Sequence, residues 1–512
     1  MSSVSDRRPL AAAAVALLVL IGGCDRSVQP TETLPPLQAA SLDADAGAWR
    51  MFVLAAPEQV AVAAPAATTS DAYRAELAAV KAAQAAMTRA QRANVEYWSG
   101  GGVLRWNQVM RELVARYNLP PAPRPDGSYP VPDAENPFAD PNFPFASPPY
   151  AARAYSYVSV AQYEALKATW HWKFRYNRAA PAKVDAGVQA LAPVGDLPAY
   201  PSEDAVLAGA TAEMLKLLFP GSVEEITRRA AEEREAALLS GRATASDVAA
   251  GLALGRSVAA LVIARARADG MGAAGGTAAL WQGMATAATA RGEVAWLSQE
   301  TPARPPMLPN FGAVQAWTMT AAQLATLDPP APPSTSSARM AEDLAEVKRV
   351  TSNLTREQLA VALKWNDGAG TYTPPGHWND IAAEYVRDAR MSEVRAARVF
   401  AALNMAMHDA AVACWAIKFR HYNPRPVQLD PTIKTSIGLP NFPAYPSGHS
   451  TFSAAASTVL GAYFPSAAGE FAAQAEEAGI SRLYGGIHYR ADIENGKAHG
   501  LRIGAAVVQA VR

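Results

Sequence analysis

The residues best suited to chemistry lie in three short motifs near the carboxyl end of this 512-residue chain. Residues 418–426 have the pattern K-x6-R-P, residues 446–449 are Pro-Ser-Gly-His, and residues 481–492 have the pattern S-R-x5-H-x3-D. Together the motifs supply three cations, two imidazoles, a hydroxyl and a carboxylate. This set of groups suits the binding and turnover of a small oxyanion that carries more than one negative charge.

Five of these residues are predicted to bind the oxyanion. Lys418 supplies a point charge, and Arg425 and Arg482 supply planar guanidinium groups that can contact two oxygens at once. Ser447 can donate from its hydroxyl, and Gly448 has no side chain, so its backbone N–H can approach an oxygen closely. The motifs therefore predict a site that binds through fixed charge and short donors.

Three further residues are predicted to carry the chemistry. His488 has a ring nitrogen that can act as a nucleophile. Asp492 lies four residues later, one helical turn away, and can hold the ring in a single tautomer so that the opposite nitrogen is free. His449 is the predicted general acid, which then activates water as a general base.

An internal repeat separates these residues from structural ones. Residues 170–175 match residues 415–420 and residues 198–202 match residues 443–447, with a single offset (418 − 173 = 245). At this offset the first copy has lost most of the reactive side chains. The counterparts are Ala180 for Arg425, Asp204 for His449, Ala237 for Arg482 and Ala243 for His488, whereas Lys173 and Asp247 match Lys418 and Asp492. The chemistry is therefore predicted for the second copy alone.

Helices must position these residues. The chain is rich in Ala, its apolar residues recur at helical spacing, and its 39 prolines lie mostly between the Ala-rich segments. We expect an all-α fold with two tandem helical bundles, residues 73–267 and 340–512, and an active site in the C-terminal bundle. Residues 268–339 are expected to connect the bundles, and residues 25–72 are expected to form a Pro/Ala-rich tether.

In this order, the three motifs resemble the superfamily of type 2 phosphatidic acid phosphatases, bacterial non-specific acid phosphatases and vanadium-dependent haloperoxidases. The resemblance implies one of two enzymes. A metal-independent phosphatase would form a phospho-histidine at His488 and act on a small phosphate ester without a cofactor. A haloperoxidase would use His488 as the vanadium ligand, hold vanadate as its cofactor, and act on peroxide and halide.

The sequence leaves these alternatives open. Residues 374–379, Pro-Pro-Gly-His-Trp-Asn, resemble the haloperoxidase branch, and so do Trp415 and Phe442. Phosphomonoester hydrolysis is nevertheless favoured slightly, because phosphate esters are the commoner substrate outside the cytoplasm. A third interpretation is a phosphate-binding scaffold lipoprotein, but simple anion capture needs neither the nucleophile His488 nor the proton donor His449.

The other histidines are expected to have structural roles. His377, His408 and His421 are predicted to be capping or buried polar residues, and His171 and His499 to be structural or on the surface.

The first 24 residues have the layout of an export signal. Two arginines precede the apolar run 10–21, and the following Gly-Gly-Cys resembles a bacterial lipobox, in which Cys24 is acylated. We expect an extracytoplasmic lipoprotein, on the periplasmic side, anchored to a bacterial membrane. The 46 basic and 46 acidic residues balance, so no nucleic-acid partner is expected.

Overall fold

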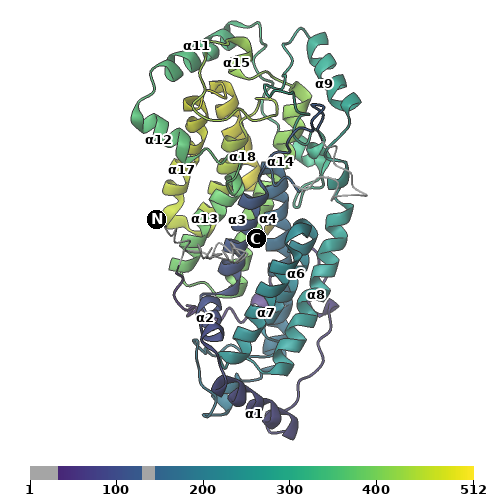
Figure 1. The fold of residues 1–512 in the computed structure, drawn as a ribbon, viewed down its shortest axis with the longest axis vertical. Helices are drawn as coiled ribbons and strands as arrows, with labels where there is room; N and C mark the ends of the chain where they lie inside the picture. Colours follow the sequence, from purple (N-terminus) through teal and green to yellow (C-terminus); the bar gives the residue numbers. More distant parts are fainter. Residues whose placement is uncertain (1–32, 130–143, 512) are drawn as a thin grey trace, which may run out of the picture. The chain divides into compact units, whose positions relative to one another are not determined.

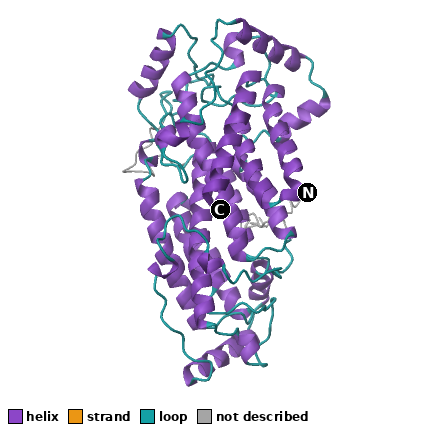
Figure 2. Ribbon diagram, turned by 180° about the vertical axis from the view of Figure 1, so that it is seen from behind, coloured by secondary structure: helices purple, strands orange, loops and turns teal. Residues whose placement is uncertain are grey.

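The computed structural model describes residues 33–129 and 144–511, and every regular element within these residues is a helix (Figure 2). The all-α fold predicted from the Ala-rich, proline-punctuated sequence is therefore confirmed. The expected signal segment, residues 1–24, and Cys24 with it, lies outside the described residues.

Sixteen α-helices form the two halves that the repeat predicts (Figure 1). The first half contains α1 (Asp71–Ala85), α2 (Arg89–Trp98), α3 (Gly102–Tyr117), α4 (Pro148–Tyr176), α5 (Pro181–Val184), α6 (Glu203–Leu218), α7 (Val223–Leu239) and α8 (Ala245–Ala268). The second contains α11 (Ala338–Ser352), α12 (Arg356–Lys364), α13 (Thr373–Asp388), α14 (Glu393–His421), α15 (Pro426–Leu429), α16 (Gly448–Tyr463), α17 (Ala468–Tyr484) and α18 (Arg490–Val511).

The helix bounds follow the offset found in the sequence. Each of the helices α4 to α8 begins 245 residues before its counterpart among α14 to α18. The backbone at the ends of the long helices α4 and α14 also agrees, since Asn177 and Tyr422 both adopt the left-handed conformation, with φ of 49° and 60°. Equivalent sequence therefore forms equivalent helices and equivalent helix ends.

Residues 33–69 differ from the expected tether. Leu34, Asp43 and Leu54 are buried, and Glu164 on α4 accepts hydrogen bonds from the backbone N–H groups of residues 52–54 at 2.7–3.3 Å. The segment also contains the short helices η1 (Ala46–Ala48) and η2 (Pro57–Gln59), which lie against α4. The tether prediction is wrong for this segment, because its backbone groups and scattered apolar residues find fixed partners on α4.

Residues 298–334 lie on α14 in the same way. Asp409, the counterpart of Glu164, accepts from the backbone N–H groups of Trp317 and Thr318 at 2.7 and 3.0 Å. The short helix η6 (Phe311–Ala313) packs on α14 as η1 packs on α4, and α10 (Ala321–Ala325) follows it in the chain. We call residues 33–69 the first strap and residues 298–334 the second strap. The second strap makes up about half of residues 268–339, which were expected only to connect the two bundles.

The straps share one detail that requires glycine. A Cβ on Gly47 would lie 3.0 Å from the backbone of His171, and a Cβ on Gly312 would lie 2.5 Å from the backbone of Ala416. His171 and Ala416 are themselves separated by the offset of the repeat. Both straps therefore approach their long helix closely enough to exclude a side chain.

The two long helices α4 and α14 pack against each other, and one continuous hydrophobic core contains residues from both halves. Four polar residues lie within this core and bind one another across the halves. Asn404 donates to Ser159 at 2.9 Å and to Asn379 at 2.9 Å, and Asn107 also donates to Asn379 at 2.9 Å. Because Asn404 and Ser159 are counterparts in the repeat, this cluster marks the axis that relates the two halves.

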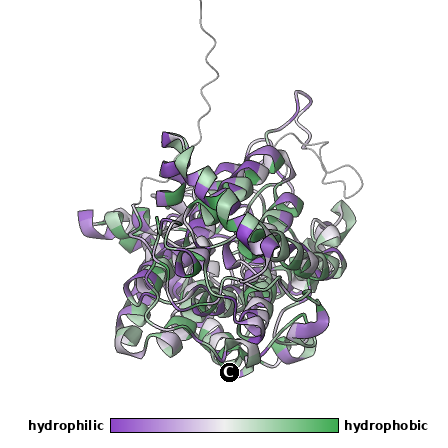
Figure 3. Ribbon diagram, turned by 90° about the horizontal axis from the view of Figure 1, so that it is seen from below, coloured by the Kyte–Doolittle hydropathy of each residue, from purple (hydrophilic) through white to green (hydrophobic). Residues whose placement is uncertain are grey.

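Two helical stretches of the described chain, Ala245–Ala273 and Glu393–Leu429, are long and apolar enough to cross a membrane by length and composition alone. In the second stretch 94% of the apolar window is buried inside the protein, so the core accounts for its apolar character. The surrounding helices carry hydrophilic and hydrophobic residues together, as amphipathic helices do (Figure 3).

Candidate active site

The predicted site residues come together where the ends of several helices of the second half meet. Lys418 lies in the last turn of α14, Ser447 caps α16, and Arg482 lies in the last turn of α17. Asp492 lies in the first turn of α18, and His488 just before it. The loop that leads into α16 from α15 passes between these ends.

Lys418 is fully buried and its ammonium group is held by backbone oxygens. Nζ donates to the carbonyl groups of Pro443 at 3.0 Å and Ala444 at 2.8 Å, and also to Pro446. Burial lowers the pKa of Lys418 well below its ordinary value, because the charged form has lost its water. The lysine is thus fixed in position, and its direct partners are backbone carbonyl groups.

Arg425 is also fully buried. Its Nε and Nη2 donate to the carbonyl group of Phe442 at 3.1 and 2.9 Å, and its Nη1 donates to Ile487 at 2.8 Å. Nη1 also lies 2.9 Å from Nε2 of His488. Burial lowers the pKa of Arg425 to about 10, so the guanidinium remains charged at neutral pH.

Arg482 enters the site from the last turn of α17. It is 1% exposed, and it donates to Ser481 Oγ at 2.8 Å, to the carbonyl group of Ala362 at 3.3 Å and to that of Trp365. Burial lowers the pKa of this residue to about 10 as well. Across residues 33–129 and 144–511, no carboxylate lies at ion-pair distance from Lys418, Arg425 or Arg482.

The first half shows how the same place is neutralised without a ligand. Lys173, the counterpart of Lys418, forms an ion pair of 2.6 Å with Glu203, which stands where the second half has Gly448. Two further pairs there, Arg242 with Asp204 at 2.8 Å and Arg178 with Asp247, balance the remaining charge. At this place in the first half Lys173, Arg178 and Arg242 each have a carboxylate partner, whereas Lys418, Arg425 and Arg482 in the second half have none at ion-pair distance.

Ser447 and Gly448 begin α16 beside Lys418. Ser447 Oγ accepts from the N–H of Ser450 at 3.3 Å, which leaves its hydroxyl proton for another acceptor. A Cβ built on Gly448 would meet only ring carbons of Phe452 and Trp415, at 3.7 and 3.9 Å. The space that the Glu203 side chain takes in the first half therefore remains available at Gly448.

His488 is oriented by two hydrogen bonds. Its Nδ1 lies 2.8 Å from Asp492 Oδ2, and its Nε2 lies 2.9 Å from Arg425 Nη1. Because the guanidinium can only donate, Nε2 must accept, and Nδ1–H therefore donates to Asp492. Burial and the nearby Arg425 lower the pKa of His488 well below its ordinary value, so the ring is neutral and Nε2 has its lone pair.

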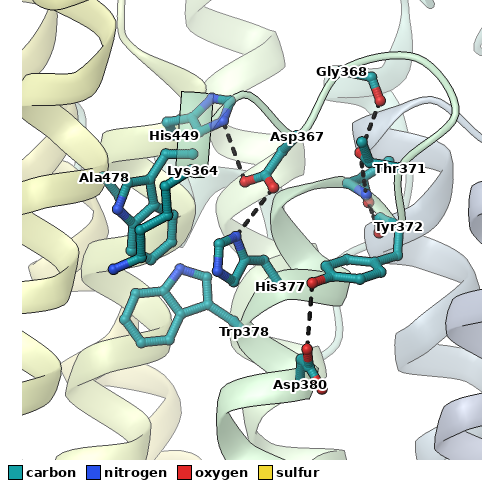
Figure 4. A network of polar contacts seen from close by, with 12 residues as sticks. Lys364, Asp367, Gly368, Thr371, Tyr372, His377, Trp378, Asp380, His449 and Ala478 are labelled. Carbon is teal, nitrogen blue, oxygen red and sulfur yellow. Dashed lines mark hydrogen bonds and ion pairs between the residues drawn. The ribbon is translucent and has the colours of Figure 1, made fainter. Parts of the chain in front are cut away.

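His449 lies at the edge of the site and is paired with an acid that the sequence analysis missed. Its Nε2 is 3.5 Å from Oδ2 of Asp367, and the other carboxylate oxygen, Oδ1, lies 3.1 Å from Nδ1 of His377 (Figure 4). Burial and Arg482 lower the pKa of His449 to about 4. The two imidazoles hold the pKa of Asp367 below its usual range, which overcomes the opposing effect of burial.

The signal for Asp367 was present in the sequence. Trp365 matches Trp98 in the first copy, and at that offset Asp367 faces Gly100, so the carboxylate is unique to the second copy. His377 joins the site through Asp367, although it was expected to have a structural role.

The remaining histidines lie away from these contacts. His408 Nε2 is 3.1 Å from the carbonyl oxygen of Gln315, His421 packs edge-on against Tyr445, and His171 lies 3.3 Å from Glu58. His499 is fully buried in α18. The ring of Trp415 packs on Phe442 with centroids 5.0 Å apart, and both rings line the side of the site next to Lys418.

The three motifs lie within a match to a known protein family. Residues 399–512 match the model of the PAP2 superfamily, and these residues contain all three motifs. No curated protein matches the chain.

Solved structures share the fold. A bacterial vanadium-dependent iodoperoxidase aligns with a TM-score of 0.56 and 24% identity, over 71% of this chain and 91% of its own. The apo form of a bacterial vanadium-dependent chloroperoxidase aligns with a TM-score of 0.50 and 15% identity, over 71% and 94% of the two chains. A holo form aligns with a TM-score of 0.50 and 16% identity, over 74% and 96%.

These alignments cover nearly the whole of the known chains, so the likeness includes both halves of the fold. Residues 399–512 therefore match the PAP2 superfamily, and the chain shares its all-helical fold, over 71% of its length, with these vanadium-dependent haloperoxidases.

Proposed function

We propose that this protein is a haloperoxidase that holds vanadate at Lys418, Arg425 and Arg482 and oxidises a halide with peroxide. The observation that carries the proposal is a set of three buried cations without carboxylate partners in a site that is almost closed. The side chain of His449 is 16% exposed, whereas those of His488 and Asp492 are 3% exposed. Such a site suits a resident oxyanion and very small reactants.

The residues present fit vanadate. Lys418, Arg425 and Arg482 would balance its charge, and Ser447 and the N–H of Gly448 would donate to its oxygens. Nε2 of His488 is the unprotonated ring nitrogen, as a metal ligand must be. The described residues hold no cluster of His, Cys, Asp and Glu that could bind a metal cation, which is consistent with an oxyanion held by positive charge.

Bound vanadate would supply the chemistry that activates peroxide toward a halide. The residues of the chain bind, orient and move protons. Asp492 holds His488 in the tautomer that leaves Nε2 unprotonated. His449, whose Nε2 lies 3.5 Å from Asp367, stands at the exposed edge, where it can take a proton from an incoming peroxide. Burial of the three cations strengthens their interaction with the oxyanion.

A phosphomonoesterase is the second candidate, and the place of His449 favours it. An ester that entered from the exposed edge would bring its leaving oxygen to His449. Nε2 of His488 would attack phosphorus, the bond to the ester oxygen would break, and His449 would protonate that oxygen. His449 would then remove a proton from water, whose oxygen would attack phosphorus and release phosphate and His488.

One parallel assay separates the two functions. The chain lacking residues 1–24 is tested for halide oxidation with a phenol dye after vanadate loading, and for hydrolysis of p-nitrophenyl phosphate. We expect oxidation that depends on both vanadate and peroxide, and its loss by more than about 100-fold in His488→Ala. His421→Gln, which changes a histidine outside the site, is the matched control.

Hydrolysis that vanadate inhibits, without halide oxidation, would replace our proposal by the phosphatase. Binding of phosphate with neither activity would leave only the scaffold interpretation.

We also propose that Cys24 carries a lipid that anchors the protein outside the cytoplasm. The proposal rests on the arrangement of the first 24 residues. Mass spectrometry of the amino-terminal peptide should show a diacylglyceryl group on Cys24, and Cys24→Ser should release the protein from the membrane. An unmodified terminus at another residue would contradict the proposal.

A further inference from the structure

Asp367 lies between two imidazoles that have no counterparts in the first half. His449 approaches one carboxylate oxygen at 3.5 Å and His377 approaches the other at 3.1 Å (Figure 4). At these three positions the first copy has Gly100, Asp204 and Arg105. The carboxylate and both of its partners are therefore specific to the half that carries the site.

His377 is held in a fixed orientation toward this carboxylate. Its ring stacks on Trp365, with centroids 4.2 Å apart and planes inclined by 22°, and its side chain is 15% exposed. Trp365 is itself fixed, because its Nε1 donates to Glu477 at 2.8 Å. The short Nδ1 contact with Asp367 is thus built into the packing.

The carboxylate of Asp367 is shared between His377 and His449. Asp367 is buried, and its two carboxylate oxygens face one ring each. A hydrogen bond donated by His377 to this carboxylate reduces the negative charge that His449 experiences. From this geometry we propose that His377 is a positioning residue that competes with His449 for Asp367 and so sets how readily His449 takes up and releases a proton.

Other charged groups face the two rings. Arg482 on α17 opposes protonation of His449. Glu477 on α17, itself paired with Lys364 on α12 at 2.7 Å, lies near His377. At the N-cap of α13 the ring of Tyr372 lies edge-on to His377, and its hydroxyl donates to Asp380 at 3.3 Å. None of these groups lies between Asp367 and the two histidines, so the competition is local.

The inference deepens the proposed function, because His449 is its proton carrier, but its test does not depend on turnover. The imidazole signals of the seven histidines are titrated by NMR in the chain lacking residues 1–24, and the His449 signal is assigned by its loss in His449→Gln. His377→Phe keeps the stacked ring and removes Nδ1. We expect this change to raise the midpoint of the His449 titration by about one pH unit, because Asp367 is left to His449 alone.

Two further variants complete the test. Asp367→Asn should lower the midpoint, and His377→Leu, which has no donor, should raise it if His377→Phe does not fold. His421→Phe, a histidine outside this group, should leave it unchanged. An unmoved His449 midpoint in the folded His377 variants would overturn the inference. A shifted midpoint in a protein with neither halide oxidation nor hydrolysis would instead overturn the proposed function and leave this inference standing.

Discussion

At the scale of single residues, the two halves differ in where a carboxylate lies. Glu203 neutralises Lys173 in the first half, and Gly448 leaves Lys418 without such a partner in the second. The same backbone can therefore hold either a side-chain carboxylate or an external anion.

This exchange predicts the effect of Gly448→Glu. The new carboxylate should pair with Lys418 and occupy the space of the oxyanion, so that phosphate and vanadate bind at least about 100-fold more weakly, about 3 kcal/mol. Isothermal titration calorimetry measures the affinity. The control variant Gly469→Glu adds the same charge at an exposed position in the first turn of α17. It should bind phosphate and vanadate as tightly as the unchanged protein does. Unchanged binding in Gly448→Glu would show that the oxyanion lies elsewhere.

His499 offers a test of pH dependence. Both ring nitrogens of this buried residue are without a hydrogen-bond partner, and burial lowers its pKa to about 3. The unfolded chain therefore binds a proton below about pH 6.5 that the folded chain does not, so folding stability is lost as the pH falls from 6.5 toward 3.

His499→Leu removes this dependence. Relative to the wild type, the variant should gain about 1.4 kcal/mol of unfolding free energy for each pH unit below 6.5. Urea denaturation at pH 7, 6 and 5 measures the difference. A constant difference between the two proteins across this range would mean that His499 titrates alike in the folded and unfolded chains, which contradicts the prediction.

At the scale of elements, the straps depend on one carboxylate each. Glu164 on α4 accepts from three N–H groups of the first strap, and Asp409 on α14 accepts from two N–H groups of the second. The hydrogen bonds join irregular backbone to a buried helix, so little else replaces them.

Loss of one carboxylate should loosen its own strap alone. Glu164→Ala should increase amide hydrogen exchange within residues 33–69, and Asp409→Ala should do so within residues 298–334, each by about tenfold or more. Mass spectrometry of exchanged peptides compares the two variants directly. Faster exchange spread over both straps in either variant would mean that the straps are not independent elements.

The elements were predicted best from the sequence where the types and spacing of side chains define them. Ala-rich helices, the repeat and the positions of Lys418, Arg425 and Arg482 follow from residue types and spacing. The straps could not be predicted, because their likeness lies in backbone contacts with α4 and α14 rather than in shared side chains. The pairing of Asp367 with His449 required a contact between α16 and the loop before α13, which spacing alone does not give.

At the scale of the whole molecule, one hydrophobic core joins the two halves. In the proposed function, the buried cations of the second half bind an anion. We predict a single thermal unfolding transition that shifts upward by several degrees at phosphate concentrations well above its dissociation constant. Differential scanning calorimetry with and without phosphate tests this. Two separate transitions, or a shift that persists in Gly448→Glu, would contradict the prediction.

The carboxylate of Glu203 also has an evolutionary consequence. Replacing Glu203 by glycine would leave Lys173 buried and unpaired, although the site would still lack Arg425, Arg482, His449 and His488 equivalents. Every early step back toward a working site therefore lowers stability before any activity returns. Because Glu203 balances the charge of Lys173 without a ligand, we expect that a site in the first half could be regained only through several substitutions made together.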